Sequence, residues 1–331
     1  MKDFEKTESN KKEDFITWLK FLACLLITNS HCRDIYPLFF LAVGGGHGNA
    51  IFFAVSGYCL AHIRSGFCAW YGKRLKRILP VFCIVLFFAV FFMDGMASLR
   101  LWGFGGSFLH YVDKYWFIPA ILIYYLAYYF LLKPKNPKVV FFALILYVAI
   151  YIFLYLFVVD TSVFSLELEG FSPIKVYFYF GIFLLGGLLR LLQAEIRKRL
   201  EGKERKCLIG FIGGILLSGI VWCCIYAEMM LLDRAYSLQF LIHLSVFIFI
   251  LFLFLLCMAY APKIKIPGNR GGKIVSCLAA STLEIYLVQV TFKTIAVPFD
   301  FPLNGLLFFT IAIGGGVLLH RICEPVLRLW K

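Results

Sequence analysis

Long, continuously apolar runs constrain this chain more than any other feature of its sequence. Residues 81–93 read VFCIVLFFAVFFM and residues 241–260 read LIHLSVFIFILFLFLLCMAY, without alternation of polar and apolar positions. A transmembrane β-barrel would show that alternation along strands of about ten residues. The runs therefore favour membrane-spanning α-helices. The hydrophobic share of 62% supports this, because soluble domains contain about 45–50% apolar residues.

We therefore expect an all-α polytopic membrane protein with about ten transmembrane helices. Residues 1–14 and 326–331 would form cytoplasmic tails on either side of one integral membrane domain at 15–325. The expected spans are 15–33, 48–64, 78–95, 115–132, 139–159, 173–190, 207–227, 236–260, 274–297 and 304–321.

The distribution of basic residues predicts the orientation of the chain. If the N-terminus is cytoplasmic, 27 of the 33 Lys and Arg residues fall on cytoplasmic segments, as the positive-inside rule requires. The net charge of +14 then reflects topology, and no nucleic-acid partner is expected. The outer segments keep only Arg33, Arg100, Lys114, Lys175, Arg234 and Lys293.

The eleven cysteines include no CxxC pair, and most lie within apolar runs. They are typical of small buried side chains rather than of a disulfide framework or a metal site. No metal is expected.

A few ionisable residues within the expected spans are candidates for function, because each costs about 2.5–3.5 kcal/mol to insert. Lys20 and His31 are eleven residues apart, which places them on one helix face, separated by about 16 Å. Asp34 follows His31 on the same face and could fix its tautomer. Glu284 is the most deeply placed carboxylate. Each of these residues also has a structural alternative. Lys20 could extend its charged end toward the membrane surface, His31 could be an ordinary interfacial residue, and Glu284 could anchor neighbouring helices by a hydrogen bond.

A basic cluster of Lys73, Arg74, Lys76 and Arg77 precedes a helix that is expected to begin near Pro80. It would face the cytosol and could bind a highly anionic ligand there. The alternative is that these charges only set the topology.

Five short motifs, in order over residues 20–325, resemble the membrane-bound acyltransferase-3 family, bacterial enzymes that modify surface glycans and related acceptors. They are Lys20 with ten residues before His31; Gly48-Asn49-Ala50-Ile51-Phe52-Phe53-Ala54-Val55-Ser56-Gly57-Tyr58; Arg74, Arg77, Ile78 and Pro80; Trp116-Phe117-Ile118-Pro119-Ala120; and Ser281 with Ile285-Tyr286-Leu287-Val288-Gln289, followed by Glu324-Pro325.

Two positions depart from the family pattern. Lys20 replaces an arginine, which keeps the charge but loses the bidentate fork that suits phosphate or carboxylate. Gln289 replaces a histidine, so that position is not expected to transfer protons here.

The resemblance implies an integral membrane O-acyltransferase of the bacterial cytoplasmic membrane. It would move an acyl group, typically acetyl, from acyl-CoA to a hydroxyl of a glycan or lipid-linked saccharide. Acyl-CoA would be a co-substrate, with no bound cofactor. The implied roles are His31 as general base with Asp34 beside it; Lys20, Lys73, Arg74 and Arg77 in donor binding; and Ser56, Trp116, Glu284 and Tyr286 in support.

Several alternatives stay open at this point. Direct transfer and an acyl-histidine intermediate are both compatible with the motifs. Neither the acceptor nor the acyl length is set by the sequence. A transporter or flippase for glycans or lipids could use Lys20, His31 and Glu284 as a substrate and proton pathway, and would be expected to show paired broken helices. A membrane scaffold with decayed motifs is the third alternative.

Overall fold

The computed structural model describes residues 13–90, 114–166, 172–296 and 299–329, and these residues form helices and no strands. The all-α prediction is therefore confirmed for this part of the chain. Residues 1–12 of the expected N-terminal tail, the end of the expected span 78–95, Arg100 and residues 330–331 lie outside it.

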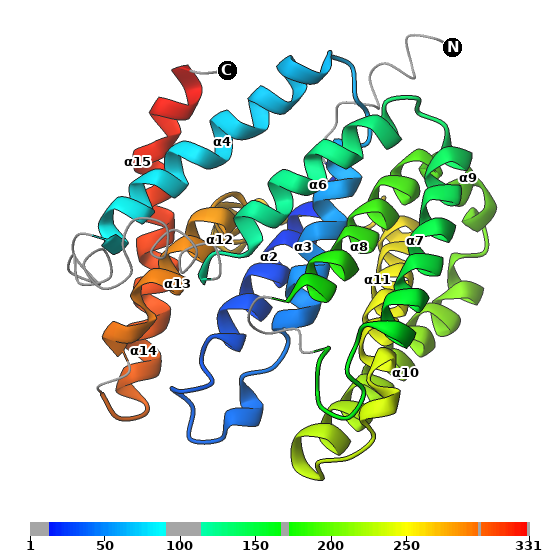
Figure 1. The fold of residues 1–331 in the computed structure, drawn as a ribbon. Coiled ribbons are helices and arrows are strands. Elements are labelled where there is room, and N and C mark those ends of the chain that lie inside the picture. The colour runs from blue at the N-terminus through cyan, green and yellow to red at the C-terminus, as the bar shows by residue number, and fades with distance from the viewer. Residues whose placement is uncertain (1–12, 91–113, 167–171, 297–298, 330–331) are drawn as a thin grey trace.

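The order of the helices can be followed in Figure 1. They are α2 (Asp14–Ser30), α3 (Gly45–Leu60), α4 (Phe67–Phe88), α6 (Phe117–Leu132), α7 (Pro137–Phe157), α8 (Pro173–Leu191), α9 (Gln193–Leu200), α10 (Glu204–Leu231), α11 (Phe240–Tyr260), α12 (Arg270–Ala280), α13 (Thr282–Ala296), α14 (Leu303–Phe309) and α15 (Gly316–Leu329), with short turns η1 (Phe39–Leu41), η3 (Tyr236–Leu238) and η4 (Thr310–Gly315).

Five helical stretches among the described residues are long and apolar enough to cross a membrane, or six if α12 and α13, bent by 69°, form one span. The helices α2, α3 and α6 overlap expected spans but contain only 17, 16 and 16 residues. At 1.5 Å per residue they cover about 24–26 Å, less than the hydrocarbon thickness of about 30 Å. The count of about ten spans therefore stays a prediction.

Four of the segments that were predicted to be cytoplasmic lie toward one end of the bundle. In Figure 1 the first turn of α4, the turn between α6 and α7, the short helix α9 and the last turn of α15 are all at the top. Which side faces the cytosol remains a prediction from the charge distribution.

The close approach of α3 and α8 forms the centre of the bundle. A Cβ atom added at Gly57 would lie 2.0 Å from the carbonyl oxygen of Phe183, and one at Gly186 would lie 2.0 Å from that of Ala54. The two backbones can therefore touch only because both positions lack side chains, as is common between helices in membranes. Tyr128 of α6 donates a hydrogen bond of 2.5 Å to the Gly57 carbonyl and fixes α6 against the same point.

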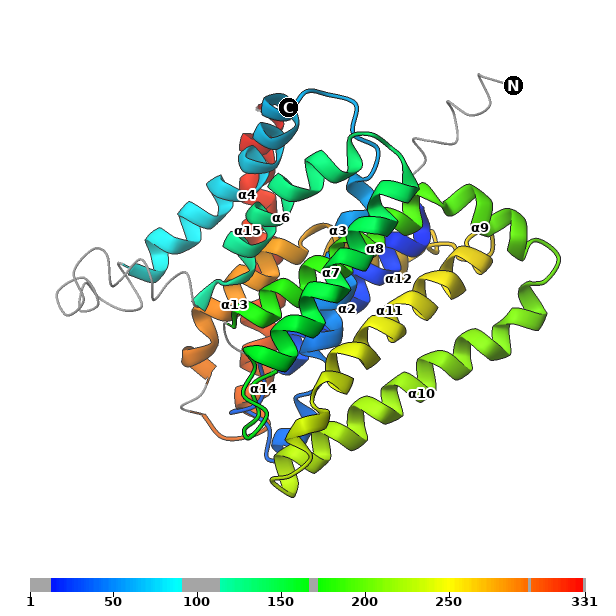
Figure 2. The same ribbon diagram turned by 45° about the vertical axis from the view of Figure 1, so that its right-hand side comes forward.

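The outer helices carry the apolar surface that faces lipid. In α8, 67% of the most apolar stretch is buried inside the bundle, whereas in α10 only 6% of the corresponding stretch is buried. The hairpin of α10 and α11 stands at the edge of the bundle in Figure 2. Exposed large side chains on α7 and α10, such as Phe142, Leu156, Ile209 and Leu217, would be unfavourable in water and suit a bilayer.

The start of α2 is tied to the rest of the bundle through Glu13. Its carboxylate accepts hydrogen bonds from Tyr58 of α3 at 2.8 Å, from Gln193 at 2.6 Å and from Arg197 at 2.7 Å, the last two on α9. Because a partly buried carboxylate needs such partners, this cluster fixes the position from which α2 runs toward His31.

We predict that Gly186→Ala disrupts the contact between α3 and α8, because the added methyl group would overlap the Ala54 carbonyl. Overpacking of this kind costs about 1–3 kcal/mol or more, so the melting temperature in detergent should fall. Gly219→Ala in α10 is the matched control: nothing lies within 4 Å of its added Cβ, and its melting temperature should not fall. Equal melting temperatures for the two variants would contradict this account.

Candidate active site

His31 lies directly after the last residue of α2, where its ring turns back on the helix. Its Nδ1 lies 2.8 Å from the carbonyl oxygen of Ile27, an oxygen that can only accept a hydrogen bond. In the neutral ring Nδ1 therefore carries the proton, and Nε2 keeps a lone pair. The helix end thus holds the imidazole in the tautomer that a general base needs, with Nε2 directed away from the helix carbonyl.

The partner of the His31 ring is not the one that the sequence suggested. Asp34, expected to hold a ring nitrogen, instead forms an ion pair of 2.6 Å with Lys293 of α13. The physical reason is local: the His31 ring bonds to the Ile27 carbonyl in the last turn of α2, which also accepts from the Ser30 hydroxyl. The Asp34 side chain is 61% exposed and reaches across to the neighbouring helix.

Two contacts set the register between α2 and α13. Ile27 and Tyr286 line the same pocket, and Asp34 pairs with Lys293. Both steps are seven residues in the same direction, so the two segments run parallel. In this register Val290 falls level with His31, and Gln289 lies one residue before it. Gln289 is only 1% exposed, and its amide nitrogen and oxygen have no hydrogen-bond partner among the described residues.

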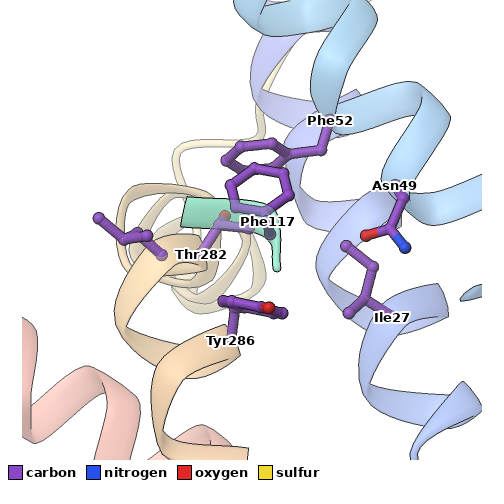
Figure 3. Close-up of a pocket in the computed structure, with 7 residues that line it drawn as sticks. Ile27, Asn49, Phe52, Phe117, Thr282 and Tyr286 are labelled. Atoms are coloured by element: carbon purple, nitrogen blue, oxygen red, sulfur yellow. The ribbon is translucent and has the colours of Figure 1, made fainter. Parts of the chain in front are cut away.

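The pocket between these helices is narrow, and three of its seven lining residues are aromatic. Figure 3 shows Phe52 and Phe117 above Tyr286, with Ile27 and Asn49 on the facing helices. Phe52 and Phe117 meet edge to face, and Phe117 is tilted against Tyr286. The ring centroids of Phe52 and Phe117 are 5.1 Å apart, and those of Phe117 and Tyr286 are 5.4 Å apart. The lining residues are Ile27, Asn49, Phe52, Phe117, Thr282, Leu283 and Tyr286.

Glu284 faces away from this pocket, toward α15. One of its carboxylate oxygens lies 2.9 Å from Nδ1 of His320, and the side chain is 3% exposed. The pairing joins α13 to α15 and corresponds to the structural alternative considered for this carboxylate. His, Cys, Asp and Glu side chains nowhere gather in threes that could ligate a metal within the described ranges.

Trp116 and Ser56, both expected to support the site, lie at contacts of the central helices. The ring of Trp116 is buried and packs 5.7 Å from Tyr179, with the ammonium of Lys175 4.0 Å above it. Cation–π contacts of this kind hold a charge in an apolar setting, and they fix the start of α6 against α8. Ser56 precedes Gly57, at which α3 meets α8.

The predicted donor-binding cations lie on α4, which packs against α6, α13 and α15. Arg74 donates to the Trp70 carbonyl at 3.1 Å, and its guanidinium lies 4.4 Å from the centre of the Trp70 ring. Lys73 and Arg77 are exposed. Lys20 lies on α2, partly buried. The α4 cations thus form a group separate from the pocket beside His31.

Several pocket residues were not singled out from the sequence. Asn49, Phe52 and Phe117 lie inside motifs that were quoted as landmarks, without a role of their own. Ile27 lies four residues before His31. That spacing places it on the His31 face of α2, and this was the signal that could have identified it.

An aromatic pocket within an apolar bundle, next to a histidine with a free ring nitrogen, is an arrangement suited to group transfer in a membrane. A family model for an acyltransferase domain, acyltransferase family 3, matches residues 13–321. Searches of curated proteins and of solved structures gave no match. Because the matched region is nearly the whole chain, the protein belongs to this acyltransferase family and is a membrane acyltransferase.

We predict that Asp34→Asn lowers acyltransferase activity by less than about tenfold, because an exposed ion pair contributes only about 0–1 kcal/mol. A carboxylate that fixed the tautomer of His31 would instead cost about 10⁴-fold, as in serine proteases. The double variant Asp34→Lys with Lys293→Asp should recover the activity lost in either single variant. A loss near 10⁴-fold without recovery would show that Asp34 acts on the ring itself.

Proposed function

We propose that this protein transfers an acetyl group from acetyl-CoA to a hydroxyl of a glycan or lipid-linked saccharide at the bacterial cytoplasmic membrane, with His31 as general base. The observation that carries the proposal is the contact between His31 Nδ1 and the Ile27 carbonyl. It leaves Nε2 able to take a proton, and neutral imidazole is the side chain best suited to that task near pH 7.

The reaction can be written with His31 as the only proton carrier. Nε2 takes the proton of the acceptor hydroxyl while that oxygen attacks the thioester carbon. When the tetrahedral intermediate collapses, the C–S bond breaks and the new ester forms. The protonated Nε2 then gives its proton to the departing CoA thiolate, which restores the neutral ring.

The cations of α4 are proposed to bind the phosphates of CoA. Guanidinium groups form bidentate hydrogen bonds to phosphate. Arg74 is already held on Trp70, so less side-chain entropy is lost on binding. The side chains of Lys73 and Arg77 are exposed and can bind the phosphates at the nucleotide end of CoA. Lys20, on the His31 helix, would contact the donor closer to its thioester as a single point charge.

Gln289 is proposed to hold the acceptor. It lies on α13 between Tyr286 and Lys293, one residue before the position level with His31, and its buried amide has both a donor and an acceptor to offer. A sugar with adjacent hydroxyls can satisfy both at once. The Gln289 amide neither gains nor loses a proton near neutral pH, so its role is to orient the acceptor rather than to transfer a proton.

The transporter alternative gains no support, because the family match identifies an acyltransferase. One bent helix pair, α12 with α13, occurs among the described residues. An inverted-repeat transporter would be expected to show a second one in the corresponding half.

We predict that His31→Gln lowers the rate of acetyl transfer by about 10²–10⁴-fold, the usual contribution of a general base. The rate can be measured as thiol released from acetyl-CoA, with hexose and N-acetylhexosamine oligosaccharides as acceptors and purified protein in lipid nanodiscs. His62→Gln is the control, because His62 is an exposed residue between α3 and α4 and should leave the rate unchanged. If His31→Gln is as active as wild type, His31 is not the base.

We predict that Arg77→Ala raises the KM for acetyl-CoA by about fivefold or more while kcat changes little, since one charge-assisted hydrogen bond contributes about 1.5–3 kcal/mol before solvent screening. The effect should shrink at high salt. Lys198→Ala in α9 removes another exposed cation from a helix outside this cluster and should leave KM unchanged. An equal change in both variants would mean that the cations act only through the overall charge.

A further inference from the structure

We propose that the pocket between Ile27, Asn49, Phe52, Phe117 and Tyr286 is the acyl subsite, sized for an acetyl group, and that the Tyr286 hydroxyl donates a hydrogen bond to the thioester carbonyl oxygen. This inference rests on the proposed function and adds to it a structural basis for the short acyl group and an oxyanion donor. The family resemblance implied acetyl as typical and gave Tyr286 a supporting role without a task.

The position of the pocket relative to the base supports this assignment. Ile27 lines the pocket with its side chain, and its own carbonyl oxygen holds the His31 ring at 2.8 Å. The pocket therefore opens one helical turn, about 5.4 Å along the axis, from the proposed base. With the methyl group in the pocket, the attached carbonyl carbon would lie at the pocket mouth, within reach of an acceptor hydroxyl held at His31, as direct transfer requires.

The size of the pocket favours the shortest acyl group. The rings of Phe52, Phe117 and Tyr286 close one side, and Leu283 and Ile27 line the rest with Thr282 and Asn49. The space left between these side chains accommodates about one water-sized group. A methyl group is of that size, whereas each further methylene would have to displace packed aromatic rings, which is costly in a tightly packed interior.

The Tyr286 hydroxyl is the polar feature of the pocket that lacks an acceptor. The side chain is 8% exposed, and the hydroxyl donates to no residue in the described part of the chain. Buried tyrosine hydroxyls usually have a partner, and an exception calls for an explanation. Tyr286 and Ile27 line the same pocket, and in Figure 3 the Tyr286 ring lies below Phe117 and across from Ile27 of α2, so a carbonyl bound in this pocket would lie near the hydroxyl.

The chemistry needs no further group. When the acceptor oxygen adds to the thioester carbon, the carbonyl π-electrons move onto its oxygen, and the Tyr286 O–H stabilises that charge by a hydrogen bond without giving up its proton. The electrons return when the C–S bond breaks. Surrounding aromatic side chains exclude water, so one such donor can contribute about 10²–10³-fold to the rate.

The inference is tested by comparing acetyl-, propionyl- and butyryl-CoA in the thiol-release assay with the same oligosaccharide acceptors. In wild-type protein the rate should fall by about tenfold or more with each added methylene, because size discrimination in an apolar pocket starts at about tenfold per methylene. Ile27→Ala should raise the butyryl-to-acetyl rate ratio by about tenfold or more. Ile250→Ala, a fully buried residue of α11 away from the pocket, should leave that ratio unchanged.

Tyr286→Phe tests the oxyanion donor separately. It keeps the ring and removes only the hydroxyl, so kcat for acetyl-CoA should fall by about 10²-fold while KM and the melting temperature stay close to wild type. A fall in melting temperature with unchanged kcat would show a structural role only and overturn this part of the inference.

The outcomes separate the two levels of the proposal. Equal rates with all three donors in wild type, or an unchanged ratio in Ile27→Ala, would overturn the acyl subsite while leaving the acyltransferase reaction in place. If folded wild-type protein releases no thiol from any of the three donors, the proposed function itself is overturned, and the subsite with it.

Discussion

The contact between the backbones of α3 and α8 is the constraint on which the other arrangements depend. Only glycine at positions 57 and 186 allows each helix to meet the carbonyl oxygens of the other. Once this distance is set, α3 presents Asn49 and Phe52 on the side that faces α2 and α6. Apolar side chains alone cannot fix such a geometry in a membrane, because lipid solvates them equally well.

A second pair of helices, α2 and α13, turns this frame into a site. They run parallel, with Ile27 and Tyr286 sharing one pocket and with Asp34 paired to Lys293 beyond it. Between these contacts lie His31 and the buried amide of Gln289. Acid–base and hydrogen-bonding groups thus occupy the space between two apolar helices, where a low dielectric strengthens each polar interaction.

The sequence was sufficient for the helical class and for the family, because both follow from local signals: apolar runs, and short motifs of fixed spacing. It also identified His31 and Tyr286 as candidates. It could not show that Ile27, rather than Asp34, would hold the His31 ring, since that choice depends on how the helix ends. Nor could it separate Glu284 from the pocket, because only the packing of α13 against α15 reveals which face Glu284 occupies.

The number of spans cannot be read from length and hydropathy alone. Short helices such as α3 are buried by their neighbours, so they need not be as long or as apolar as a helix that faces lipid.

Because of the break between α12 and α13, the site should tolerate substitutions better than insertions or deletions. Thr282 and Leu283 form part of the pocket wall directly after the 69° bend, and Tyr286, Gln289 and Lys293 follow on one continuous helix. Substitution at any one of these positions alters one contact. Insertion or deletion of a single residue after the bend would rotate all that follows by about 100° and would move the entire row away from α2 together. We therefore expect the segment from Thr282 to Lys293 to keep a fixed length among relatives of this chain, even where the residues themselves vary.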